Sequence, residues 1–335
     1  MALILIDGFD HYTNAQAYDK EIEYSNGSIG SVASRFGIGQ GLVNSDANYL
    51  TTLNIGVNKS TIYFGIACKK VTGGSPSLTI SWPWIRFRDE SDVDQIQFCL
   101  NSLYGIAVYD GADALLGSTA DYVVPDQRWF YLEGKITISA TVGEVTLRVN
   151  ETQVLNLTSQ DTKNGSDYIR KISLSGIQSS IVAYYDDLYI DDAQFHGDCR
   201  IRAFTPDSIS GTNNSFMASA GNKDECVDES ISNDDTDYIY SDTLNHKQGF
   251  GITTGVLGTV KAIQLNNHVR IDEAGTRKIK PLIRSNGADY QGTETDEITA
   301  EYLFESEIFE TDPDDAAAWT QTKLEAAEFG LEITT

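Results

Sequence analysis

Two strand-like stretches bracket the first part of the chain: LILIDGFDHY from Leu3 to Tyr12 and YYDDLYIDD from Tyr184 to Asp192. Both are rich in the aliphatic and aromatic residues that favour strands. After about residue 195 a chemically different pattern begins. We therefore expect a first domain that opens with one stretch and closes with the other.

Apolar residues between these stretches recur with a period of two, as in a sheet that turns one face to a core. The alternation is clear in Ile62–Ile66, Ile96–Leu100 and Val145–Val149, and turn residues such as Thr72–Pro76 separate the runs. Because no helical pattern intervenes, these short strands predict an antiparallel sandwich.

The chain has 335 residues, of which 41% are hydrophobic, and this is enough for two cores. We place the domains at 1–196 and 197–335. In the second domain, Val260–Arg270 and Arg277–Arg284 predict two strands joined as a hairpin, and Tyr302–Phe309 predicts another strand.

A helix is expected only near the C-terminal end of the sequence. Gln321–Phe329 has a helical composition, with Thr320 as its N-cap and Gly330 past its end. The predicted fold class is therefore mainly β: an antiparallel sandwich followed by a second β-rich domain with one short helix.

Motifs in a set order run through both domains. In the first domain they are Asp7–Tyr12, Arg35–Leu42, Trp129–Glu133, Glu144–Asn150, Asp161–Thr162 and Asp186–Asp191. In the second they are Gly197–Ile201, Cys226–Glu229, Asp234–Tyr238, Ala262–Gln264, Asp272–Arg277, Glu310–Asp314 and Ala318–Thr320. This order resembles tailed-phage virion proteins that begin with a concanavalin A-like (laminin-G-like) jelly-roll domain. The resemblance implies a jelly roll whose first and last strands lie side by side, followed by a virion-associated domain.

Charge and hydropathy exclude several classes of partner. The net charge of −25 arises from 49 acidic and 24 basic side chains, so the average surface field repels nucleic acid. No apolar stretch approaches the roughly 18 to 20 residues that span a bilayer. The apolar N-terminal stretch is too short for a secretion signal and lacks its basic residues. We expect a virion protein assembled in the host cytoplasm, without nucleic acid or membrane insertion.

None of the four cysteines has the spacing of a zinc module. Cys68 and Cys99 lie in strand-like runs and are expected to be buried free thiols. Cys199 and Cys226 flank the start of the second domain. They remain free or form a disulfide, depending on whether folding brings them close.

Four aspartates surround the closing stretch: Asp186, Asp187, Asp191 and Asp192. Alternation turns Asp186 toward the apolar side, where a buried carboxylate needs donors. We expect these from the opening strand and the imidazole of His11, so that Asp186 and His11 lock the first strand to the last. A calcium or glycan site built from the four aspartates is the alternative, because calcium prefers carboxylate oxygens.

Trp82 and Trp84 are the aromatic pair best suited to contact a sugar or a protein partner. At positions i and i+2 of a strand they share one face, where their rings stack on a pyranose or fill a subunit pocket. Core packing is nevertheless the favoured interpretation for both tryptophans. The four histidines lack metal-ligand spacing, so calcium is the only cofactor under consideration.

Catalytic spacing is missing from the strand-like runs. Glycosidases on jelly rolls of this kind present acids as E-x-D-x-x-E or E-x-D-x-E. The nearest match, Glu90-Ser-Asp92-Val-Asp94, lacks the last glutamate and falls among turn residues. From this we expect a protein without enzymatic activity.

The leading interpretation is a non-enzymatic structural protein on the surface of a tailed-phage virion, as a tail-associated or tail-fibre component that contributes to host adsorption. A capsid decoration protein is the first alternative. A glycan-binding module and a polysaccharide depolymerase are further alternatives. The expected partners are other virion proteins, further copies of the chain in a homo-oligomer, and a host-surface glycan.

Overall fold

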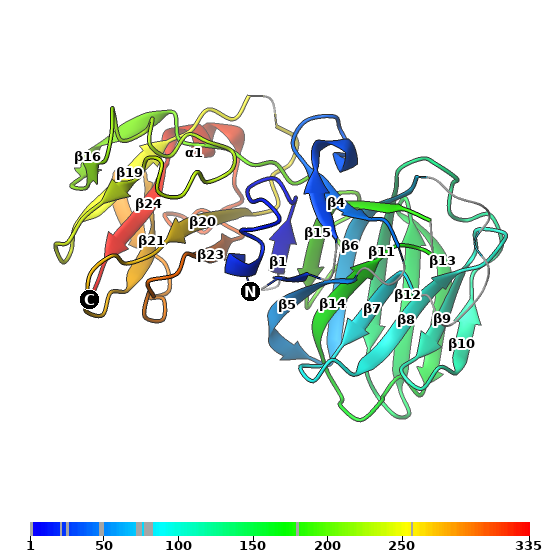
Figure 1. Cartoon of the computed structure of the whole chain (residues 1–335). Coiled ribbons are helices and arrows are strands. Elements are labelled where there is room, and N and C mark those ends of the chain that lie inside the picture. Colours follow the sequence, from blue (N-terminus) through cyan, green and yellow to red (C-terminus); the bar gives the residue numbers. More distant parts are fainter. Residues whose placement is uncertain are drawn as a thin grey trace. The chain divides into compact units, whose positions relative to one another are not determined.

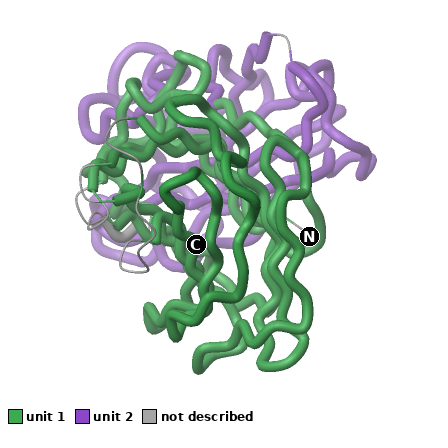
Figure 2. Tube along the Cα trace, turned by 90° about the vertical axis from the view of Figure 1, so that its right-hand side faces the viewer, with its two compact units in different colours: residues 1–202 green, residues 203–335 purple. Residues whose placement is uncertain are grey.

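The computed structural model describes residues 3–20, 22–24, 27–46, 50–71, 76, 83–178, 181–255 and 257–335. The chain divides into two compact units, Met1–Arg202 and Ala203–Thr335 (Figure 2). The division follows Arg202, whereas the sequence places the boundary after residue 196. Residues 197–202 stay with the first unit because they bond to it, for example through the Ile201 N–H, which donates to Asp187 Oδ1 at 2.7 Å.

The first unit is an antiparallel jelly-roll sandwich whose two sheets form two layers in Figure 1. Sheet A has the order β13-β12-β11-β6-β15-β4-β3, and β1 also pairs with β15. Its strands are β1 (Leu3–Asp7), β3 (Ser28–Gly30), β4 (Gly41–Asn44), β6 (Thr61–Lys70), β11 (Phe130–Thr137), β12 (Gly143–Val149), β13 (Thr152–Gln160) and β15 (Ala183–Asp191).

Sheet B has the order β10-β9-β8-β7-β14-β5-β2. Its strands are β2 (Ile22–Tyr24), β5 (Leu50–Lys59), β7 (Ile85–Arg88), β8 (Asp94–Leu100), β9 (Ile106–Asp110), β10 (Leu115–Ser118) and β14 (Ile169–Ser175). Two short 3-10 helices, η1 (Tyr18–Lys20) and η2 (Ser31–Ala33), lie between the first strands of the unit.

The closing strand β15 organises sheet A. Its residues Leu188–Asp191 pair with β1, residues Ala183–Tyr185 pair with β4, and β6 runs along the opposite edge. The first and last strands of the unit are therefore neighbours. The prediction of an antiparallel jelly-roll sandwich is confirmed.

Alternation along the strands places the core between the sheets. Phe64 of sheet A contacts Phe87 and Phe98 of sheet B, with ring centroids 4.9 and 6.0 Å apart, and all three rings are buried. Burial of apolar surface contributes about 25 cal/mol per Å² to folding. The residues that alternate with these rings project outward, so each sheet also has an outer face.

None of the four cysteines, all of which lie in the described part of the chain, forms a disulfide. Cys68, Cys99 and Cys226 are buried, and Cys199 is partly exposed. Burial raises the pKa of the Cys99 thiol to about 12. Such a thiol stays protonated at neutral pH and packs as a small apolar group, as expected for the strand cysteines.

The second unit combines a five-stranded sheet of order β16-β19-β24-β21-β22 with two ribbons, β17-β18 and β20-β23. Its elements are β16 (Ser208–Asn214), β17 (Met217–Ala218), β18 (Ile239–Tyr240), β19 (Lys247–Gly251), β20 (Ile263–Val269), β21 (Ile279–Ser285), β22 (Ala288–Gln291), β23 (Leu303–Phe309), α1 (Gln321–Ala326) and β24 (Glu328–Ile333). In the part of the chain that the structure describes, no helix has the length and hydrophobicity to cross a membrane.

The predicted hairpin of the second unit is wrong. Its two strands exist as β20 and β21, but β20 pairs with β23, whereas β21 lies between β22 and β24. Each strand takes the partner that completes a buried face, and a short turn between two strands does not determine that choice.

The predicted C-terminal helix exists but ends early. Thr320 is its N-cap and accepts a hydrogen bond from the Lys323 N–H. The helix stops at Ala326, because Glu328–Ile333 instead form β24 between β19 and β21. Gly330 therefore lies within a strand, opposite Gly249 and Leu282.

Candidate functional site

On one side, β15 pairs with β4 before Asp186 and with β1 after Asp187. The pairing with β6 is irregular between Asp186 and Tyr189, and Asp187 has a left-handed φ of 52°. Tyr185 and Leu188 are both fully buried, so two residues rather than one separate consecutive inward positions. This bulge breaks the alternation that would place Asp186 on the inner face with Leu188. The expected inward orientation of Asp186 is therefore wrong.

The two aspartates at the bulge are bound by the chain that surrounds β15. Asp186 accepts hydrogen bonds from the N–H groups of Arg35 and Asp187, both at 2.8 Å. Asp187 accepts from the Ile201 N–H at 2.7 Å and from Arg35 Nη1 at 3.3 Å. These donors replace the expected ones from the opening strand and from His11. Asp186 keeps a structural role, with different partners.

The opening strand carries its own buried carboxylate, Asp7. It accepts hydrogen bonds from the Phe9 N–H at 2.8 Å, the Tyr12 hydroxyl at 2.9 Å and Lys20 Nζ at 3.1 Å. His11 Nε2 lies 2.9 Å from the same Lys20 Nζ. Burial raises the pKa of Asp7, but the charges of Lys20 and His11 outweigh it and hold the pKa below its usual value. His11 therefore supports Asp7.

Three neighbouring carboxyls have raised pKa values. Burial, assisted by the negative charges of Asp187 and Asp7, raises the pKa of Asp10 to about 6. Burial and the charge of Asp187 raise the pKa of Asp186, and burial raises that of Asp187. The guanidinium of Arg35 lies in this cluster, where it bonds Asp198 at 2.7 and 2.6 Å as well as Asp187, and Arg200 is a second positive charge near Asp10 and Asp187.

The four aspartates of the calcium alternative are held by other groups. Asp191 accepts from the N–H groups of Ala193 and Gln194 and lies 2.7 Å from His196 Nε2. Asp192 pairs with Lys59 Nζ at 2.6 Å. Among the residues with a described placement, no three His, Cys, Asp or Glu side chains are arranged to hold a metal ion.

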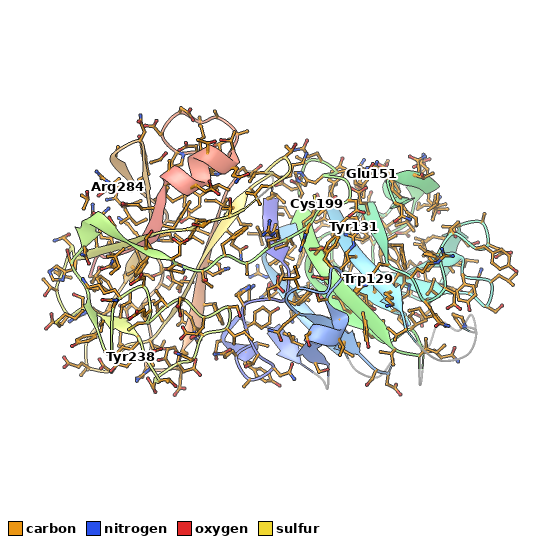
Figure 3. All side chains as sticks on the ribbon, turned by 90° about the horizontal axis from the view of Figure 1, so that it is seen from above. Trp129, Tyr131, Glu151, Cys199, Tyr238 and Arg284 are labelled. Carbon is orange, nitrogen blue, oxygen red and sulfur yellow. The ribbon has the colours of Figure 1, made fainter. Side chains whose placement is uncertain are left out.

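Residues 193–201 cover the outer face of sheet A. The Phe195 ring packs edge-on against Tyr63 of β6, with centroids 5.0 Å apart. Figure 3 shows Cys199 beside Tyr131 of β11, in line with the electrostatic interaction between them. The Tyr131 hydroxyl donates to the Asp187 carbonyl at 2.9 Å. The outer face of this sheet is therefore largely internal to the unit.

Glu133 of β11 is the centre of this covered face and is fully buried. Its Oε1 accepts from the Tyr189 hydroxyl at 2.8 Å and from the Gly197 N–H at 2.9 Å. Its Oε2 pairs with Arg148 Nη1 at 3.0 Å. Every one of these partners comes from the same unit, so the arrangement holds the covering segment in place.

Trp84 is packed in the core, which is the interpretation that the sequence favours for it. Trp84 is 1% exposed and packs against Phe130 and Tyr185, with centroids 6.2 and 6.4 Å apart. Its ring is in the core, which removes it from the candidate sugar or partner contacts. Trp82 lies outside the described residues.

The outer face of sheet B carries a row of polar side chains that crosses the strands. Ladder pairing places opposite one another Thr52 of β5, Ser173 of β14, Arg86 of β7, Gln97 of β8 and Tyr109 of β9. Leu115 of β10 continues the row. Directly paired residues share one face of a sheet, so these side chains lie next to one another.

A second set of charges lies beside this row. Lys171 of β14 is paired in register with Arg88 of β7. Lys171 Nζ lies 3.0 Å from Asp92 Oδ1, and Arg88 Nε donates to Asp94 Oδ1 at 2.8 Å. Two acids of the incomplete glycosidase motif, Asp92 and Asp94, are thus partners of basic residues.

Unlike Arg88 and Lys171, Arg86 has no close acidic partner among the described residues. Within the described part of the chain its ion pair, from Nη1 to Asp94 Oδ2, is 3.7 Å long, and 20% of its side chain is exposed. Burial lowers the pKa of Arg86, and the nearby charge of Arg88 adds to this effect, whereas Asp94 opposes it.

Next in the row, Gln97 Nε2 donates to Asp113 Oδ1 at 2.8 Å. Burial raises the pKa of the Tyr109 hydroxyl, which keeps it a hydrogen-bond donor.

The signal for this face is present in the sequence. In Ile85-Arg-Phe-Arg88 and Asp94-Gln-Ile-Gln-Phe98, polar residues alternate with the apolar ones. The apolar half of the alternation predicts the strands. The polar half marks the outer face, but only the strand order shows that the two runs are neighbours.

Some solved structures of known proteins resemble this chain in fold. No known family profile matches the chain, and no curated protein is similar in sequence. Among solved structures, an alginate lyase mutant in complex with alginate trisaccharide has 11% identity and a TM-score of 0.36, over 57% of this chain and 98% of that one. An endo-β-1,4-glucuronan lyase from Trichoderma reesei has 12% identity and a TM-score of 0.38, over 56% and 98%. A carbohydrate esterase of the Shiga toxin-encoding bacteriophage phi24B has 10% identity and a TM-score of 0.35, over 57% and 100%.

These neighbours correct one expectation from the sequence. The chain is expected to be non-enzymatic, partly because its jelly roll lacks a glycosidase motif. Two lyases and an esterase are among the similar structures, so the expectation is contradicted: the absence of one carboxylate motif does not exclude catalysis on such a fold. At this level of identity the likeness concerns the fold, and the activity of each neighbour belongs to that neighbour.

Proposed function

We propose that the first unit binds an extended carbohydrate chain across the outer face of sheet B. The observation that carries the proposal is the row of side chains in register on neighbouring strands, from Thr52 to Tyr109 and on to Leu115. The exposed or partly exposed members, Arg86, Tyr109 and Leu115, lie on strands β7 to β10, and at about 4.8 Å per strand spacing they extend over roughly 14 Å. That length matches an oligosaccharide rather than a single sugar.

The chemistry of the row suits carbohydrate. Within the row, Arg86 and Tyr109 are partly exposed, whereas Thr52, Ser173 and Gln97 are buried. The Arg86 guanidinium and the Tyr109 hydroxyl are therefore the polar groups that the row presents to sugar hydroxyls, which donate and accept hydrogen bonds. Tyr109 and Leu115, which is 56% exposed, form an adjoining apolar patch for the flat face of a pyranose ring. Because these groups stand on strands rather than loops, they are held rigid before the ligand arrives.

The test is a glycan array with the full chain, followed by calorimetric titration of the glycans that bind. Tyr109→Ala removes the stacking surface, and we expect about tenfold weaker binding, equivalent to about 1.4 kcal/mol. Tyr122→Ala is the matched control, since Tyr122 is 70% exposed outside the row. Failure to bind any glycan, or equal binding by Tyr109→Ala and wild type, contradicts the proposal.

We also propose that this unit operates on the surface of a tailed-phage particle, as a tail-associated or tail-fibre component that aids host adsorption. The ordered motifs in both domains and the net charge of −25 support this setting. A capsid decoration role rests on the same features. Further copies of the chain and other virion proteins are the proposed partners. Mass spectrometry of washed particles tests the setting, and absence of the chain from them contradicts it without affecting the sugar-binding proposal.

A further inference from the structure

We propose that the carbohydrate bound on the outer face of sheet B carries carboxylate groups, and that the guanidinium of Arg86 is the residue that recognises them. This inference rests on the proposed function and specifies its ligand class as an acidic glycan, such as a polyuronate. It depends on the difference between Arg86 and the two other basic residues beside it.

Arg88 and Lys171 already have close acidic partners. Arg88 Nε bonds Asp94 at 2.8 Å, and Lys171 Nζ bonds Asp92 at 3.0 Å. The one ion pair of Arg86 reaches the other oxygen of Asp94 at 3.7 Å, which is beyond hydrogen-bond distance. Within the described part of the chain, no side chain or backbone group accepts a hydrogen bond from the Arg86 guanidinium, and its buried Nε is among the atoms left without a partner.

Leaving Arg86 in this state costs free energy. A half-buried charge loses hydration, and a guanidinium has five N–H donors in a planar fork that fits a carboxylate through two parallel bonds. A ligand carboxylate would give the Arg86 guanidinium both a close negative charge and hydrogen-bond acceptors. A neutral hydroxyl would restore neither charge nor fork geometry.

The surroundings of Arg86 allow one carboxylate but not a dense polyanion. Asp92 and Asp94 pair closely with Lys171 and Arg88, and Asp113, another acid near Arg86, accepts a hydrogen bond from Gln97, so among the described residues no acid lies within hydrogen-bond distance of Arg86. The chain as a whole carries −25, which repels polyanions at long range. Recognition therefore depends on a short-range contact. A glycan with spaced carboxylates and many hydroxyls fits this better than nucleic acid with a phosphate at every step.

The experiment compares matched pairs of ligands. Oligomers of galacturonate, mannuronate, guluronate and glucuronate are titrated into the full chain, alongside the same oligomers after chemical reduction of each carboxylate to a primary alcohol. We expect at least one oligouronate to bind, and its reduced form to bind about tenfold more weakly or worse. Arg86→Gln should weaken the oligouronate by a similar factor and leave the reduced form unchanged.

Two further variants make the result interpretable. Arg86→Lys keeps the charge but loses the fork, so we expect intermediate affinity, and it serves as the test if Arg86→Gln fails to fold. Arg128→Gln removes one positive charge from an exposed position of the same unit and should leave affinity unchanged. Equal binding of acidic and reduced oligomers, with loss in Tyr109→Ala, overturns the acidic ligand but keeps the carbohydrate site. Absence of binding by every oligomer and by the array overturns both.

Discussion

The outer faces of the two sheets in the first unit use the same kinds of side chain in opposite ways. On sheet A, the Oε1 of buried Glu133 accepts hydrogen bonds from Tyr189 and Gly197, its Oε2 has an ion pair of 3.0 Å with Arg148 but no hydrogen bond within the described part of the chain, and residues 193–201 cover the face. On sheet B, half-buried Arg86 has a single ion pair of 3.7 Å among the described residues.

The difference lies in how fully each charge is satisfied by the chain itself. A buried charge with a close ion pair and hydrogen bonds contributes to the fold, whereas a partly desolvated charge with neither costs stability and persists where it serves another purpose. The acid-rich end of β15, which is the more conspicuous feature in the sequence, belongs to the first class. The less conspicuous Arg86 belongs to the second.

The largest effect is expected on sheet A. Glu133→Ala leaves Arg148 and two buried donors without their acceptor, and we expect the free energy of unfolding to fall by about 3 to 5 kcal/mol. Urea denaturation of the full chain measures it. Glu144→Ala is the control, because its partner Lys135 and Glu144 itself are each about a quarter exposed, and it should cost about 0 to 1 kcal/mol. Equal losses would remove the distinction between covered and open positions.

A smaller loss is expected at the bulge of β15. Asp186→Ala leaves the N–H groups of Arg35 and Asp187 without their acceptor. We expect a loss of about 1 to 3 kcal/mol in the free energy of unfolding. Asp192→Ala, which removes a partly exposed pair with Lys59, is the control and should cost less. An unchanged denaturant midpoint for Asp186→Ala rules out its structural role.

The pH dependence of stability tests the carboxyls around this bulge. The pKa of Asp10 rises from 3.8 to about 6 in the fold, and those of Asp186 and Asp187 also rise. Between the unfolded and folded pKa values the native state holds more protons, so the contribution of these three carboxyls to stability is fully present below about pH 4 and is lost as pH rises through the folded values. We expect the melting temperature to drop by a few degrees from pH 5 to pH 8, and Asp10→Asn to reduce this drop. A rising melting temperature contradicts the assignment.

The smallest effect on stability is expected on sheet B. Arg86→Leu removes a partly desolvated charge and breaks no hydrogen bond recorded in the structure, so the free energy of unfolding should change by less than about 0.5 kcal/mol or increase. Thermal melting of the two proteins measures it. A loss comparable to that of Glu133→Ala shows that Arg86 is structural, which makes the two faces equivalent.

Part of this organisation follows from local sequence. Alternation in Ile96–Leu100 predicts β8, and Thr320 predicts the start of α1, because both depend on neighbours within a few residues. The hairpin predicted between β20 and β21 fails because strand pairing depends on burial of whole faces. The orientation of Asp186 fails because a bulge of one extra residue reverses every later position, and period alone does not reveal it.

By itself, the sequence determined the mainly β class, the neighbouring first and last strands of a jelly roll, and the acidic surface, since these depend on composition, period and the order of motifs. Only the tertiary structure decided which charges are satisfied. Glu133 and Gly197 are 64 positions apart in the chain and bonded, whereas Arg86 and Asp94 are only eight positions apart and stay 3.7 Å from each other. Hydrogen bonding acts over about 3 Å in space, so a candidate site becomes visible only when the strands are in register.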